Sequence, residues 1–162
     1  MSTATPGATE APYDGRTLVV DTSAWGVLRR ALGHAQTHQL VADFQAGLMN
    51  GQLRGCDAVK LEMLHGARDP AEFVALEANL DRIPTLPITS TASRGAVGAL
   101  RDLSARATGA NPRLHRVGHG DALVAAVAAE RGFDVLHYDQ HFDTLATVLN
   151  FDSVWIAARG QF

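Results

Sequence analysis

The sequence predicts an α/β domain in which helices cover both faces of a parallel sheet. Its clearest strand is the short β-branched run at residues 17–20, which ends in Asp21 and lacks the polar alternation of a surface strand. Extended and helical patterns then alternate along the chain, as in successive βαβ units. Almost every residue from 121 to 129 is apolar, which predicts a helix that packs centrally.

The other elements follow from apolar periodicity and from turn residues. Apolar residues at helical spacing predict helices near residues 25–32, 40–48, 59–66, 73–80, 96–103 and 142–149. Short extended segments are expected at residues 52–56, 83–88, 133–137 and 153–156. Gly51 ends the second helix, and Pro70 opens the fourth at a position where proline is tolerated.

Size and composition predict one domain. A chain of 162 residues with 46% apolar residues can bury one substantial core, which we place at residues 16–159. Residues 1–15 have almost no large apolar side chain and are expected to form a disordered tail. The single cysteine, Cys56, cannot form an internal disulfide. No apolar run approaches the roughly 18 residues that span a bilayer, so we expect a cytoplasmic protein with no membrane partner.

Four acids stand at the edges of apolar segments: Asp21, Glu62, Asp121 and Asp139. A carboxylate at the edge of a core is destabilising by several kcal/mol unless something compensates it, and one divalent cation can compensate several. Because ligands of an open parallel sheet bind at the carboxyl ends of its strands, we expect these acids to converge there. Hard oxygen ligands favour Mg²⁺ or Mn²⁺, and such a site suits hydrolysis of a phosphodiester.

These acids and their neighbours also have structural interpretations. Asp21 can cap the helix that starts near Ser23, and Asp121 can complement a helix dipole. The hydroxyl groups of Thr22 and Ser23 can either cap that helix or bind Asp21. Both interpretations remain open at this point.

The charge distribution is uneven. A net charge of −3 is not typical of a nucleic-acid-binding protein, but residues 91–120 contain five arginines and one acid, Asp102. Arg113 and Arg116 lie just before Asp121 and are the best candidates to contact RNA phosphates. Ordinary solvated surface charge is the alternative.

Three histidines lie within two residues of Asp121 or Asp139: His119, His137 and His141. We assign them no catalytic role, because no two share a recognised ligand spacing on one helix.

Four passages, taken together, resemble the PIN-domain ribonuclease toxins of the VapC type. They are Leu-Val-Val-Asp-Thr-Ser-Ala at residues 18–24, Glu-Met-Leu-His-Gly-Ala-Arg at 62–68, Gly-Asp-Ala-Leu-Val-Ala-Ala-Val-Ala at 120–128 and His-Tyr-Asp-Gln-His-Phe-Asp at 137–143. Their order and separation match the family over residues 16–159. The resemblance implies a PIN-like three-layer α/β/α sandwich and a metal-dependent endoribonuclease, the toxin of a type II toxin–antitoxin pair.

The resemblance also implies roles for individual residues. Asp21, Glu62, Asp121 and Asp139 match the acidic quartet of the family, and Ser23 matches its usual hydroxyl. Asp21 and Asp121 would bind Mg²⁺ directly, with Mn²⁺ as a substitute, and Glu62 and Asp139 would bind it directly or through water.

The implied partners are a second copy of the chain in a homodimer, a VapB-type antitoxin that occludes the site, and a structured RNA such as tRNA or rRNA cleaved in a single-stranded loop. One position departs from the family, whose members often have a second acid where this chain has His141. The alternative function is therefore a degenerate PIN module that binds RNA or protein without cleavage.

Overall fold

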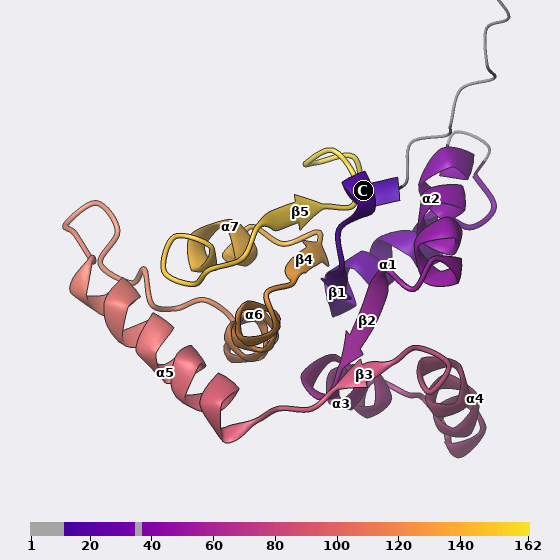
Figure 1. The fold of residues 1–162 in the computed structure, drawn as a ribbon, viewed down its shortest axis with the longest axis horizontal. Helices are drawn as coiled ribbons and strands as arrows, with labels where there is room; N and C mark the ends of the chain where they lie inside the picture. The colour runs from indigo at the N-terminus through magenta and orange to yellow at the C-terminus, as the bar shows by residue number, and fades with distance from the viewer. Residues whose placement is uncertain (1–11, 35–36) are drawn as a thin grey trace, which may run out of the picture.

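A computed structural model describes residues 12–34 and 37–162, and shows five parallel strands in the order β3-β2-β1-β4-β5 (Figure 1). The strands are β1 (Leu18–Val20), β2 (Leu53–Cys56), β3 (Thr85–Leu86), β4 (Asp134–His137) and β5 (Ser153–Trp155). β1 is central and pairs with β2 on one side and with β4 on the other. The chain therefore moves outward from β1 in both directions, and its strand order reverses between β1 and β4.

Helices connect the strands. They are α1 (Thr22–Ala31), α2 (His38–Met49), α3 (Asp57–His65), α4 (Pro70–Leu80), α5 (Ser90–Ala105), α6 (His119–Arg131) and α7 (His141–Leu145). Within the described residues, none of these helices is long and apolar enough to cross a membrane.

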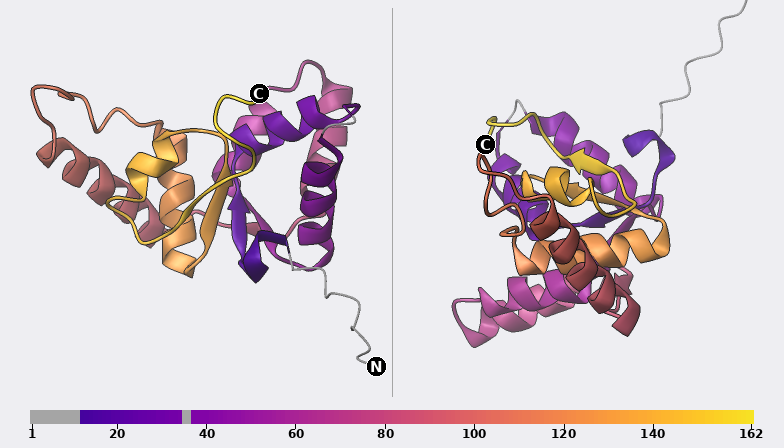
Figure 2. Two further views of the ribbon diagram at one scale, coloured as in Figure 1. Left: turned by 90° about the horizontal axis from the view of Figure 1, so that it is seen from above. Right: turned by 90° about the vertical axis from the view of Figure 1, so that its left-hand side faces the viewer.

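The sheet separates two apolar cores. Val19 and Val135 face a core that includes residues of α3, α5, α6 and α7. Their neighbours Leu18, Val20 and Leu136 point to the opposite face, where α1 and α2 pack. This alternation follows from the two-residue period of a strand, and the view from above shows helices on either side of the strands (Figure 2, left). The expected α/β fold with helices on both faces of a parallel sheet is confirmed.

Helix α6 is the central helix, as its composition predicts. Six of its residues are buried: Ala122, Val124, Ala125, Ala126, Val127 and Ala128. It packs against α5, whose small residues allow a close approach: a methyl group added to Gly95 would lie 3.6 Å from the Ala126 methyl. This packing fixes the first turn of α6, which carries Asp121, at the carboxyl edge of the sheet.

Two segments differ from the expectation. Within the predicted tail, residues 1–11 lie outside the described residues, but Pro12–Gly15 form a short turn in which Tyr13 packs against the core. Tyr13 is the only large aromatic side chain of that segment and gives it apolar surface to bury. Helix α7 ends at Leu145, earlier than the periodicity predicts, because Thr147 and Val148 bond three residues back instead of four.

Candidate metal centre and RNA cleft

Asp21 lies at the end of β1 and caps helix α1. Its Oδ2 atom accepts hydrogen bonds from the Ser23 amide at 2.9 Å and from the Ser23 hydroxyl at 2.6 Å. The residue is 3% exposed. The capping interpretation is therefore correct for Asp21, but a cap does not require burial.

Burial changes the chemistry of Asp21. Desolvation raises the pKa of its carboxyl group to about 6, against the opposing effect of the Ser23 hydrogen bonds, and the negative charge of Asp121 raises it further. In the absence of a cation, ionisation of Asp21 is thus less favourable in the folded protein than in the unfolded chain. A positive charge bound nearby would reverse that effect.

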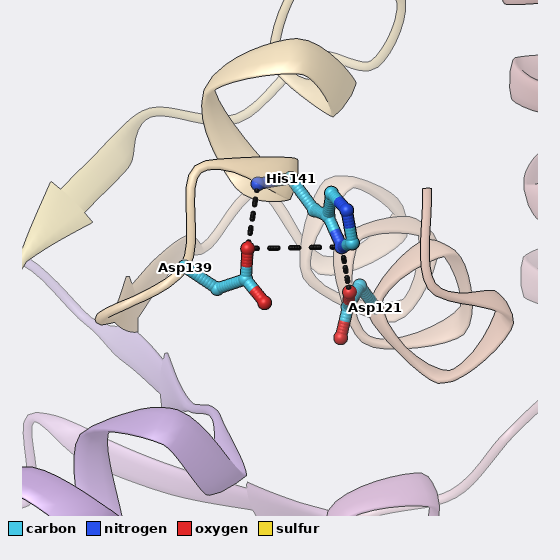
Figure 3. A group of neighbouring side chains, drawn as sticks. All are labelled: Asp121, Asp139 and His141. Carbon is cyan, nitrogen blue, oxygen red and sulfur yellow. Dashed lines mark hydrogen bonds and ion pairs between the residues drawn. The ribbon is translucent and has the colours of Figure 1, made fainter. Parts of the chain in front are cut away.

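Asp121, Asp139 and His141 form the tightest cluster of potential metal ligands in the described part of the chain (Figure 3). Asp121 comes from the first turn of α6, Asp139 from the loop after β4, and His141 from the start of α7. One donor atom from each lies within 4.8 Å of the others. His141 Nδ1 is 2.8 Å from Asp121 Oδ2 and 3.7 Å from Asp139 Oδ1.

Backbone contacts hold this cluster in place. The His141 amide donates to Asp139 Oδ1 at 2.9 Å, and the Tyr138 amide donates to the Ser23 hydroxyl at 2.9 Å. Because that hydroxyl in turn donates to Asp21, Ser23 connects Asp21 with the loop that carries Asp139. This contact is a structural reason for a hydroxyl group at position 23.

His141 Nδ1 has two polar neighbours with opposite requirements. The Gly118 amide donates to it at 3.2 Å, which needs an unprotonated nitrogen. Asp121 Oδ2, at 2.8 Å, needs a proton or a cation between the two atoms. Glycine at position 118 leaves room for the Asp121 carboxylate, which an added methyl group would displace.

Glu62 lies at the rim of the site. Its Oε2 atom accepts a hydrogen bond from the Thr22 hydroxyl at 2.9 Å and faces Gly120 in the first turn of α6. Glu62 is exposed, at the solvent-facing margin of the apolar stripe of α3. The apolar stripe of α3 turns Val59 and Met63 toward the core and leaves Glu62 at the solvent side.

Sequence reasoning noted His141 beside Asp139 but assigned it no catalytic role. Its proximity to Asp121 depends on how α7 packs beside α6, and a search for two histidines on one helix cannot detect a site assembled from three elements. The available signal was its position, two residues after Asp139, where the side chain faces the same crevice.

His137, at the end of β4, accepts a hydrogen bond from the backbone of Asp139. The ring is fully buried, its Nδ1 accepts a hydrogen bond from the Asp139 amide at 3.0 Å, and its Nε2 contacts the Ser153 hydroxyl at 2.6 Å. The Ser153 hydroxyl donates to Asp143, so His137 Nε2 carries the proton. Burial lowers the pKa of His137 to about 4.

The neutral His137 ring predicts a loss of stability in acid. A histidine with a lowered pKa in the folded state stabilises the protein above its unfolded pKa of about 6.5, and this contribution disappears as the pH falls toward 4, by up to roughly 3 kcal/mol. We expect His137→Gln to be less stable at pH 7 but to lose less stability between pH 7 and 4.5. Urea unfolding should be measured in an Asp21→Asn background, because Asp21 changes stability in the opposite direction over this range. Equal losses of stability between pH 7 and 4.5 in the proteins with and without His137 would contradict the prediction.

The structure places the two predicted arginines in a cleft beside the cluster. Arg113 and Arg116 line a depression of about 410 Å³, which His141 and Arg159 also line. Arg159 donates to Gln140, and its guanidinium lies 5.3 Å from the centre of the Trp155 ring. Arg159 escaped the sequence analysis because it is far from the arginine-rich segment, and it reaches the cleft only because β5 pairs with β4.

Comparisons with known proteins agree with this fold. The chain matches the PIN domain over residues 18–148. Ribonuclease VapC18 of Mycobacterium tuberculosis is 31% identical over 141 residues, which cover 87% of this chain and 96% of that protein. Ribonuclease VapC11 of the same species is 29% identical, with 84% and 96% covered.

Solved structures show the same architecture. A DNA-bound VapBC from Salmonella typhimurium has a TM-score of 0.64 at 16% identity, over 88% of this chain and 99% of that one. VapBC-5 from Mycobacterium tuberculosis has a TM-score of 0.57 at 22% identity, over 86% and 98%. The chain therefore belongs to the PIN-domain family. Its curated relatives are VapC ribonucleases, which confirms the resemblance found in the sequence.

Proposed function

We propose that this protein is a metal-dependent endoribonuclease and the toxin of a toxin–antitoxin pair. The observation that carries the proposal is the convergence of Asp121, Asp139 and His141 at the carboxyl edge of the sheet, next to the buried Asp21. Its relatives named as ribonucleases support RNA as the substrate.

The donor set fits a divalent cation. Around an octahedral ion with ligands at roughly 2.1 Å, adjacent donors lie about 3.0 Å apart and opposite donors about 4.2 Å apart. The 2.8 Å separation between His141 Nδ1 and Asp121 Oδ2 is close to the adjacent spacing, and the 3.7 Å separation between His141 Nδ1 and Asp139 Oδ1 falls between the two spacings. We propose Mg²⁺ as the cation, with Mn²⁺ as a substitute, held by Asp21 and Asp121 directly and by Glu62 and Asp139 directly or through water.

The bound cation would supply a nucleophile by lowering the pKa of water, and would neutralise charge on the phosphoryl oxygen. Asp21 and Asp121 would hold their carboxylates at fixed positions, because helix caps and the packing of α6 restrict them. Asp139, supported by His137, and Glu62, supported by Thr22, would orient the attacking water. Attack forms one P–O bond as the bond to the leaving oxygen breaks.

The arginine cleft gives the RNA a place to bind. Arg113, Arg116 and Arg159 would contact backbone phosphates, and the position of His141 at the cleft would put the scissile bond beside the carboxylates. This local positive charge offsets the overall net charge of −3. We propose a single-stranded loop of a structured RNA, such as tRNA or rRNA, as the substrate.

We also propose two protein partners. Structures similar to this chain include a toxin–antitoxin complex from Klebsiella pneumoniae, with a TM-score of 0.55 at 13% identity. On that basis we propose a VapB-type antitoxin that covers the arginine cleft and inhibits cleavage, and a homodimer of this chain. Inhibition of cleavage by the co-expressed partner is the corresponding test.

The function is tested by incubating purified protein with total cellular RNA in Mg²⁺, in Mn²⁺ and in EDTA, followed by mapping of new 5′ ends. We expect discrete cuts that require a divalent ion. If the RNA stays intact in every condition while this protein still binds RNA or a protein partner, the result would instead favour a degenerate PIN module that binds without cleavage.

Loss of the cleft arginines should weaken RNA binding more than the chemical step. We expect the double variant Arg113→Ala, Arg116→Ala to raise KM on the order of tenfold, and to reduce the salt dependence of binding by about 0.7 per lost phosphate contact. The matched control is Arg94→Ala, Arg101→Ala, which removes equal charge from exposed positions on α5. Filter binding across a salt series measures both effects. Equal losses in the two double variants would mean that net charge, and not the cleft, binds RNA.

A further inference from the structure

We infer that His141 is a direct ligand of the cation, and that its nitrogen donor raises the affinity of the site for Mn²⁺ or a similar transition metal ion relative to its affinity for Mg²⁺. This inference rests on the proposed function, because it concerns the same site.

The positions of three atoms support it. His141 Nδ1, Asp121 Oδ2 and an oxygen of Asp139 all carry lone pairs and face one another within 4.8 Å. A proton on Nδ1 can bridge only to Asp121 Oδ2, at 2.8 Å, because Asp139 Oδ1 is 3.7 Å away and accepts its hydrogen bond from the His141 amide instead. A cation placed among the three can contact all of them, so the arrangement suits a metal ion better than a proton.

The ring has little freedom to turn away. His141 is half-buried at the start of α7, and its amide bonds to Asp139, which fixes the backbone on that side. Its neighbour Phe142 is fully buried in the core. Nδ1, the ring nitrogen nearer the backbone, is therefore held toward the carboxylates.

The chemistry of the donor determines the ion. Mg²⁺ prefers oxygen ligands and gains little from an imidazole, whereas first-row transition metal ions bind imidazole nitrogen well. One nitrogen among carboxylate oxygens therefore shifts the relative affinity toward Mn²⁺ and its neighbours in the series. An aspartate at position 141 would restore a set of oxygen donors and shift it back.

The test uses Mn²⁺ as the probe and needs no RNA. Pulsed electron paramagnetic resonance of Mn²⁺ bound to the wild-type protein should show the modulation of a coordinated ¹⁴N nucleus, which ¹⁵N-labelled histidine replaces. His141→Asp should lose this modulation, and the Mg²⁺ concentration that displaces half of the Mn²⁺ should fall by about tenfold or more. His38→Asp makes the same change at an exposed position on α2, across the sheet, and should behave as wild type.

The outcomes separate the inference from the proposed function. Mn²⁺ bound without nitrogen modulation, together with equal Mg²⁺ competition in wild type and His141→Asp, would overturn the inference while leaving a metal-dependent nuclease intact. Failure of the wild-type protein to bind Mn²⁺ or Mg²⁺ would overturn both. The ¹⁵N-histidine experiment uses the unaltered protein, so it shows whether one of the seven histidines binds the ion even where His141→Asp does not fold; among the described residues, His141 is the histidine that lies with Asp121 and Asp139.

Discussion

Asp121→Asn is expected to reduce RNA cleavage by at least about a thousandfold while leaving the fold intact. The substitution keeps the size of the side chain and removes the charge of a direct metal ligand, and stabilisation by a bound cation amounts to several kcal/mol of the barrier. Asp121 is half-buried, and its asparagine replacement still presents an oxygen to His141 and the α6 first turn. Initial rates on the mapped RNA in saturating metal measure the loss.

The control for this prediction is Asp102→Asn, which removes an exposed acid from α5 away from the site. It should cleave at the wild-type rate. If Asp121→Asn retained more than about a tenth of wild-type activity, Asp121 would not be a ligand on which catalysis depends. Equal melting curves for both variants would exclude unfolding as the cause of the loss.

Asp21→Asn should stabilise the metal-free protein at pH 8 by about 2 kcal/mol. The pKa of Asp21 is raised to about 6 in the folded state, so the neutral acid stabilises the fold below pH 4, and this contribution is lost as the pH rises through 6. At pH 8 the wild type holds a buried charge that asparagine removes, while the amide oxygen still accepts from Ser23. A functional site of this kind lowers the free energy of unfolding of the metal-free protein.

Thermal unfolding in EDTA measures the effect. The Tm of Asp21→Asn should exceed that of the wild type by roughly 4–8 °C for a chain of this size. The difference should shrink toward pH 4, where the wild-type acid is already protonated. Adding Mn²⁺ should stabilise the wild type and not the variant, because ligand binding to the folded state alone raises stability. A variant less stable than wild type in EDTA at pH 8 would contradict the prediction.

The sequence could predict the sheet and three of the acids, Asp21, Asp121 and Asp139, because the signals for them are local. A β-branched run that ends in an acid identifies both β1 and Asp21, and the uniformly apolar α6 identifies the helix that carries Asp121. Parallel pairing then places Asp139 at the same edge, because β4 lies directly beside β1. None of these inferences requires knowledge of side-chain contacts.

The remainder depends on contacts between distant elements. His141 reaches Asp121 only through the packing of α7 beside α6, and Arg159 reaches the cleft only through the pairing of β5 with β4. The exposure of Glu62 depends on which side of α3 meets the core, which the apolar stripe defines only to within one residue. Tyr13 buries its ring against residues of α2 and β2 that follow it by tens of positions.

The order of the strands has a consequence for biosynthesis. β1 is synthesised early, yet it pairs with β4, and Leu18 of β1 lies opposite Asp134 of β4. Asp139 comes after β4 in the chain and is synthesised later still. Contacts between residues so far apart in the chain form late, after the intervening segments have left the ribosome. A nascent or prematurely terminated chain that ends before β4 therefore lacks Asp139, one of the four carboxylates, and the whole of α7. A ribosome engaged in making this nuclease is not exposed to its activity until the chain is almost complete.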